Sequence, residues 1–130
     1  MSRFTGLLHA VLRIMAGLSF MSHGTMKLLG FPAAPAALGP MPVSPLSFMG
    51  FSGLLELVGG ALVLLGLFTR PVAFVLAGEM AVGYFMVHLP HGLIPATNMG
   101  EAAYLYCFVF LWLSAAGAGP LSLDNRDKAA

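Results

Sequence analysis

Long apolar stretches with few charges constrain this chain more than any other feature of its sequence. Each stretch is close to the roughly 20 residues that a helix needs to cross a bilayer, and segments rich in proline and glycine separate them. The stretches cover about residues 6–29, 46–68, 71–88 and 99–118, and a tail of residues 119–130 follows. We therefore predict an all-α integral membrane protein, with a single four-helix transmembrane bundle as its one domain.

The composition excludes several other classes of protein. Hydrophobic residues make up 58% of the chain and charged residues only 8%, whereas soluble domains carry about 25% charged residues. Such a chain is neither disordered nor an ordinary soluble domain. The net charge of +1 gives no electrostatic basis for binding nucleic acid. A single cysteine, Cys107, excludes an internal disulfide and a zinc site built from cysteines.

The positive charges near the ends of the stretches predict an orientation. With four spans, both termini and the turn at residues 67–70 lie on one side of the membrane. That side holds Arg3, Arg70, Arg126 and Lys128, and the other side holds Lys27. By the positive-inside rule, both termini are expected in the cytoplasm.

The first apolar stretch is expected to remain in the protein as a span. It is longer than the 7–15 apolar residues of a typical signal peptide. It also contains Arg13 and His23, which a signal peptide's apolar region would not carry.

Ionisable residues occur inside the predicted spans, where a charge near the bilayer centre costs about 2.5–3.5 kcal/mol. By helix rise, Arg13, Glu56 and Glu79 fall at similar depth, so we expect them to form a buried polar core that could move a proton. Two carboxylates and one guanidinium leave an excess negative charge. Either one glutamate is protonated, or another cation enters. The alternative is a purely structural ion-pair network.

Glycines share helix faces with these charges. Gly17 and Gly24 lie on the face of the first stretch that carries Arg13, and Gly53 and Gly60 lie on the face that carries Glu56. Glycine on a transmembrane face allows close helix contact. The polar residues are therefore expected to point into a tightly packed interface.

A second polar cluster is predicted near the outer ends of the spans. His23 and Lys27 end the first stretch, and Glu101 and Tyr104 begin the last. They could supply the hydrogen-bond donors that a quinone headgroup needs. The aromatic residues expected to line an apolar slot for its tail are Phe20, Phe48, Phe51, Phe85 and Phe108. The alternative is that these rings are ordinary membrane core.

A metal site is the less favoured interpretation of this end. The imidazoles of His23, His88 and His91, together with Glu101, are ligand types that suit zinc or iron. However, Asn98 and Glu101 are already explained as a capping box at the start of a helix. We therefore predict no metal.

Three segments resemble the DoxX family of small bacterial membrane proteins. The runs are RIMAGLSF with HGTMKL at residues 13–28, ELVGGALVLLGLFTR at residues 56–70, and GAGPLSLD at residues 117–124. The resemblance implies a four-helix, multi-pass protein of the bacterial inner (plasma) membrane. It also implies a link to oxidoreductases, because DoxD-type relatives belong to a thiosulfate:quinone oxidoreductase. Arg13, Lys27 and Glu56 occupy motif positions.

Together these observations predict the membrane subunit of a quinone-linked oxidoreductase. Its partners would be the lipid bilayer, soluble redox proteins and further copies of the chain. One alternative is a non-enzymatic scaffold or assembly/chaperone protein that recruits redox partners, because more distant relatives act as membrane chaperones or cargo receptors without redox chemistry. The other is a small-solute transporter.

Overall fold

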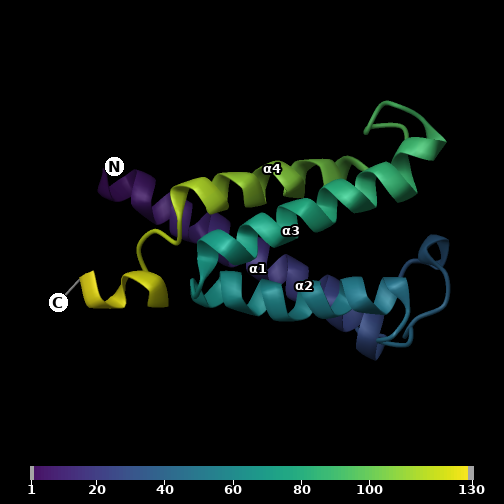
Figure 1. Ribbon diagram of the computed structural model, residues 1–130, viewed down its shortest axis with the longest axis horizontal. Coiled ribbons are helices and arrows are strands. Elements are labelled where there is room, and N and C mark those ends of the chain that lie inside the picture. Colours follow the sequence, from purple (N-terminus) through teal and green to yellow (C-terminus); the bar gives the residue numbers. More distant parts are fainter. Residues whose placement is uncertain (1, 129–130) are drawn as a thin grey trace. The chain divides into compact units, whose positions relative to one another are not determined.

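The computed structural model describes residues 2–128, and this part of the chain is helical and contains no strand. Its α-helices are α1 (Arg3–Leu29), α2 (Phe48–Leu65), α3 (Thr69–Gly83) and α4 (Glu101–Ala116) (Figure 1). Three segments are long and apolar enough to cross a membrane, namely α1, α2 and the stretch Thr69–His91 that extends α3. The all-α prediction is confirmed.

Helix α4 is shorter than the other candidate spans. Its 16 residues rise about 24 Å, against about 30 Å for the hydrocarbon core of a bilayer. A fourth span therefore stays a prediction, and so does the orientation that depends on it.

The helices form two compact units, each built from one helix pair. Helices α1 and α2 pack together and share the first unit with the tail that starts at Ala118. Helices α3 and α4 pack together in the second unit, Thr69–Gly117. We call these the α1/α2 unit and the α3/α4 unit.

Glycines allow α1 and α2 to approach each other at backbone distance. A Cβ added to Gly17 would lie 2.7 Å from the carbonyl oxygen of Gly60, and one added to Gly24 would lie 2.6 Å from the backbone nitrogen of Leu57. No real Cβ tolerates such distances. The predicted glycine face is confirmed, and it brings the polar residues of α1 against α2.

Local signals set the ends of α2 more tightly than the apolar pattern does. The hydroxyl of Ser47 accepts a hydrogen bond from the backbone N–H of Gly50, which caps the N-terminus. At the other end Gly66 adopts a left-handed conformation with φ of 66° and terminates the helix. The helix is therefore shorter than the predicted stretch of residues 46–68.

Arg70 closes the α3/α4 unit at the end of α4. Its guanidinium donates hydrogen bonds to the carbonyl oxygens of Ser114, at 3.2 Å, and Ala115. The last carbonyls of a helix lack partners within the helix, and Arg70 supplies donors to two of them. It therefore holds the start of α3 against the end of α4.

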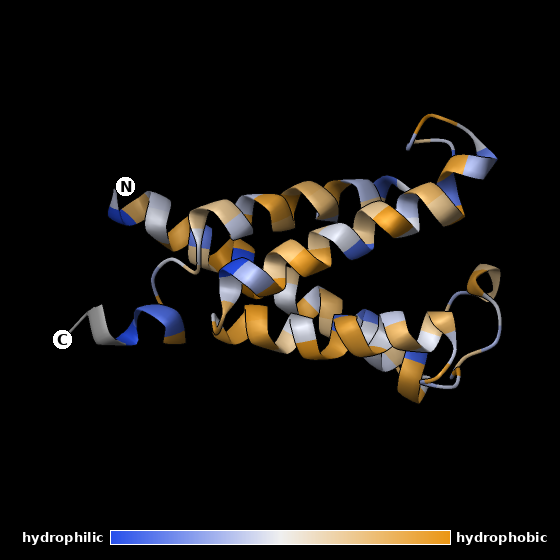
Figure 2. Cartoon of the chain, in the orientation of Figure 1, coloured by the Kyte–Doolittle hydropathy of each residue, from blue (hydrophilic) through white to orange (hydrophobic). Residues whose placement is uncertain are grey.

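Many residues along the helices are hydrophobic, as the colouring in Figure 2 shows. Large side chains such as Phe4, Phe48 and Phe74 are more than half exposed. A soluble protein rarely exposes apolar surface on this scale. These faces suit contact with lipid.

Candidate functional site

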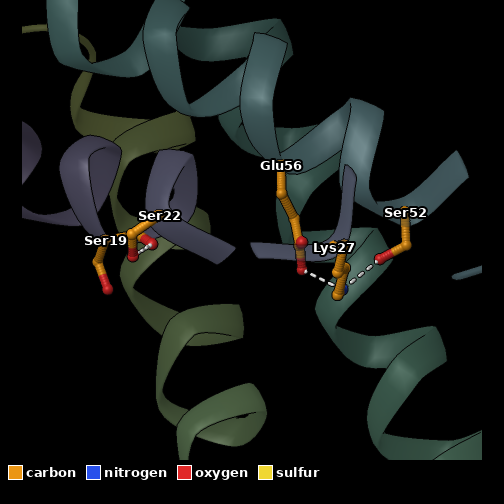
Figure 3. Close-up of polar contacts among 5 residues, drawn as sticks. All are labelled: Ser19, Ser22, Lys27, Ser52 and Glu56. Atoms are coloured by element: carbon orange, nitrogen blue, oxygen red, sulfur yellow. Dashed lines mark hydrogen bonds and ion pairs between the residues drawn. The ribbon is translucent and has the colours of Figure 1, made fainter. Parts of the chain in front are cut away.

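A buried ion pair joins α1 to α2. The Nζ atom of Lys27, near the end of α1, lies 2.7 Å from Oε1 of Glu56 and 2.9 Å from Oγ of Ser52 (Figure 3). Ser52 and Glu56 are four residues apart on α2, so both project from the same helix face. The ammonium of Lys27 sits between the two oxygens. We call Lys27, Ser52 and Glu56 the lysine–glutamate site.

A glycine positions the stem of the lysine. A Cβ added to Gly53 would lie 3.0 Å from the Cβ of Lys27. The absence of that atom lets the lysine chain lie directly against α2, within reach of the glutamate one turn further along. The sequence between Ser52 and Glu56 thus builds one half of the site from a single helical turn.

Burial makes this pair an unusual feature. The side chain of Glu56 keeps 5% of its surface exposed and that of Lys27 keeps 14%. A lone charge in such surroundings would cost several kcal/mol. The neighbouring ammonium balances the carboxylate. Lys27 is therefore the cation beside Glu56, although the predicted polar core did not include it.

The site retains unused hydrogen-bonding capacity. The second carboxylate oxygen of Glu56, Oε2, is buried and has no hydrogen-bond partner among the side chains that the structure describes, those of residues 2–126. A lysine ammonium has three N–H donors, and two of them are accounted for by Glu56 and Ser52. A buried acceptor without a donor costs about 1–3 kcal/mol. Oε2 is therefore an acceptor that no other described residue uses.

Arg13 does not join Glu56, contrary to the prediction. Its side chain is fully buried in the α1/α2 unit. Its guanidinium donates to the carbonyl oxygens of Ala118, Pro120 (3.2 Å) and Leu121 (2.7 Å) in the tail. A planar guanidinium with five donors suits a cluster of carbonyls. Arg13 therefore fixes the tail against α1.

Glu79 lies on α3 in the other unit and is half-buried. Its predicted part in moving a proton stays a prediction. The predicted contact between Arg13 and Glu56 is wrong, because the two side chains have different partners within the α1/α2 unit.

The aromatic residues expected to line a quinone slot mostly point outward. Phe20 is buried at 1% exposure, but Phe48, Phe51 and Phe85 are each 58–64% exposed, and Phe108 is 55% exposed. Four of the five rings therefore suit contact with lipid rather than an internal slot. His23 is half-buried beside Phe20, with ring centroids 6.4 Å apart.

Asn98 organises the loop before α4 instead of capping that helix. Its amide nitrogen donates to the hydroxyl of Tyr84, at 3.1 Å, and to the carbonyl of Gly92, at 2.8 Å. Its side-chain oxygen accepts from the N–H of Gly100, at 2.8 Å. Helix α4 begins at Glu101 with Gly100 as its N-cap. The predicted capping box is therefore wrong.

The remaining predicted residues are spread over the α3/α4 unit. The Nδ1 atoms of His88 and His91 contact the carbonyl oxygens of Asn98 (3.2 Å) and Val87 (2.9 Å). Glu101 is exposed. Tyr104 is 43% exposed, and its ring packs on Tyr84 and Phe108. Among the side chains that the structure describes, those of residues 2–126, no three His, Cys, Asp or Glu gather closely enough to hold a metal ion.

Comparison with known proteins assigns the family. The family model described as DoxX matches residues 8–89, which is more than half of the chain and includes the whole lysine–glutamate site. The chain belongs to the DoxX family. The predicted resemblance is thus confirmed, and with the apolar helices it identifies a DoxX membrane protein.

Two curated relatives of this DoxX chain match over most of their length. An "Uncharacterized protein" of Haemophilus influenzae is 40% identical over 120 residues, which cover 90% of this chain and 88% of the relative. A Bacillus subtilis protein named "Putative oxidoreductase CatD" is 30% identical over 115 residues, which cover 88% of this chain and 82% of the relative. No solved structure matches.

Proposed function

We propose that this DoxX protein is the membrane subunit of a quinone-linked oxidoreductase, with the lysine–glutamate site at the quinone headgroup. The observation that carries the proposal is the buried, unpartnered Oε2 of Glu56 beside the ammonium of Lys27. Buried polar groups in a span are functional candidates by default. The relative named as an oxidoreductase supports the same class of activity.

The residues of the site have separate roles in this proposal. Reduction of a quinone to a quinol consumes two electrons and two protons. A soluble redox protein supplies the electrons. Lys27 donates a hydrogen bond to the headgroup oxygen and, as a cation, stabilises negative charge that develops there. Glu56 holds the ammonium in place and relays protons, while Ser52 fixes Lys27 from the other side.

The proposed orientation in the membrane rests on the distribution of Lys and Arg near the ends of the spans. The helices form a bundle that crosses the bacterial inner membrane, with both termini in the cytoplasm. Lys27, near the end of α1, then lies toward the outer leaflet. Quinones dissolve in the apolar layer, so this end of the α1/α2 unit is accessible to them from within the bilayer. Further copies of the chain assemble around it.

The test is the quinone content of protein purified in mild detergent, measured by mass spectrometry of an organic extract. The wild type is expected to yield close to one quinone per chain. The double variant Lys27→Met/Glu56→Leu removes both polar partners together, so it leaves no unpaired charge, and it is expected to yield none. Ser22→Ala is the matched control, because the Ser22 hydroxyl donates to the carbonyl of Ser19 away from the site, and it should retain the quinone (Figure 3).

Two results would contradict the proposal. Bulk phospholipid alone in the wild-type extract would favour a non-enzymatic scaffold that recruits redox proteins. An undiminished quinone content in the folded double variant would place the quinone elsewhere on the chain.

A further inference from the structure

We propose that the lysine–glutamate site binds the hydroxyl group of a quinol in preference to the carbonyl group of the corresponding quinone. This inference rests on the proposed function and specifies which redox form the site recognises. The observations behind it are the unpartnered acceptor Oε2 of Glu56 and the remaining N–H of Lys27, held side by side by an ion pair of 2.7 Å.

Hydrogen-bond complementarity distinguishes the two redox forms. A quinone carbonyl is an acceptor only, so it can take the remaining N–H of Lys27 but leaves Oε2 of Glu56 without a donor. A quinol hydroxyl can accept from Lys27 and donate to Glu56 at the same time. The second bond is charge-assisted, and such bonds are roughly twice as strong as neutral ones. Of the two redox forms, only the quinol matches both the donor of Lys27 and the acceptor of Glu56.

Other ligand groups fit the site less well. A carboxylate would accept from Lys27 but would be repelled by Glu56, and an ammonium would have the converse problem. A hydroxyl is neutral and carries both a donor and an acceptor. The side chain of Lys27 is the more exposed of the two, at 14% against 5% for Glu56.

Tighter binding of the quinol than of the quinone predicts the direction of electron flow. A site that binds the quinol more tightly than the quinone raises the midpoint potential of the bound couple. For a two-electron couple, a tenfold difference in affinity corresponds to about 30 mV. The site therefore makes the bound quinone a better electron acceptor, so the chain takes part in quinone reduction rather than in quinol oxidation.

The experiment measures the binding of three probes to the full-length protein in nanodiscs under anaerobic conditions. The probes are decylubiquinol, decylubiquinone and the dimethyl ether of decylubiquinol, which keeps the oxygens but has no hydroxyl to donate. Wild-type protein is expected to bind decylubiquinol about tenfold or more tightly than either of the other two.

The variant Glu56→Gln provides an opposite expectation. Its amide oxygen can still accept from Lys27, so its NH₂ group takes the place of Oε2 and turns an acceptor into a donor. Decylubiquinone, which only accepts, is then expected to bind as tightly as decylubiquinol or more tightly.

The possible outcomes distinguish a failure of this inference from a failure of the proposed function. Equal or tighter binding of decylubiquinone by the wild type overturns the inference and leaves the proposed function standing. Binding of none of the probes overturns the proposed function itself. An unchanged quinol preference in Glu56→Gln also overturns the inference, because Oε2 would not be the acceptor. If Glu56→Gln does not fold, the relative affinity of the wild type for decylubiquinol and its dimethyl ether still tests the inference. Equal affinities for these two probes would overturn it.

Discussion

Replacing Lys27 with methionine is expected to lower the free energy of unfolding by about 3–5 kcal/mol. The substitution keeps an apolar stem of similar length but removes the ammonium 2.7 Å from Glu56. The carboxylate of Glu56, which is only 5% exposed, then stays buried without the ammonium of Lys27 beside it. Unfolding of the purified protein in bicelles or mild detergent measures the change.

The double variant Lys27→Met/Glu56→Leu is expected to recover most or all of that stability. Replacing a buried ion pair with apolar residues of similar volume is often neutral or stabilising, because both desolvation costs disappear. A stable double variant would mean that the pair is not retained to hold α1 and α2 together. If the double variant were as unstable as Lys27→Met alone, the pair would be a structural element of the fold.

The substitution Gly17→Ala is expected to lower the free energy of unfolding by about 2–3 kcal/mol through overpacking. The new Cβ would lie 2.6 Å from the backbone nitrogen of Leu64 and 2.7 Å from the carbonyl oxygen of Gly60. Backbone atoms cannot rotate away as a side chain can, so α1 and α2 must separate along the contact. Helix separation also displaces Lys27 from Glu56, since the two residues lie on opposite helices.

Gly78→Ala is the matched control for this prediction. Gly78 also lies within a helix, α3, but an added Cβ there meets nothing within 4 Å. Alanine is favoured over glycine in a helix by about 0.5–1 kcal/mol, so this variant should be slightly more stable than the wild type. Equal effects of the two substitutions would contradict the close contact between α1 and α2.

The helices and their glycine face could be predicted from the sequence because both depend on local pattern. Apolar stretches of about 20 residues locate spans. Glycines seven residues apart, about two helical turns, mark one helix face, and the contact of Gly17 with Gly60 follows from that face. These features need no knowledge of which side chains meet.

The partners of the buried charges are harder to predict, because the sequence gives depth only along the helix backbone. By that measure Lys27 lies at the outer end of its span and Glu56 in the middle of its own. The long, flexible lysine chain bridges that difference, as amphipathic side chains commonly do. Ser52 does carry a signal in the sequence, since it lies four residues before Glu56 on the same helix face.

The contacts of Arg13 and Asn98 cannot be predicted from the sequence for a different reason. The oxygen acceptors of Arg13 are backbone carbonyls in the tail, and one of those of Asn98 is the carbonyl of Gly92. Every residue carries a carbonyl, so the sequence does not mark which ones lack a donor. Only the path of the folded chain identifies them.

The central claim is that Oε2 of Glu56 is the acceptor that meets the bound headgroup. Infrared difference spectroscopy tests it most directly, by comparing protein with bound decylubiquinone before and after reduction to decylubiquinol. We expect a shift of a glutamate carboxylate band that is absent in Glu56→Gln. The shift should be retained in Asp124→Asn, because the carboxylate of Asp124 accepts from the N–H of Phe68 instead. A band shift that persists in Glu56→Gln, or a wild-type spectrum that shows none, would contradict it.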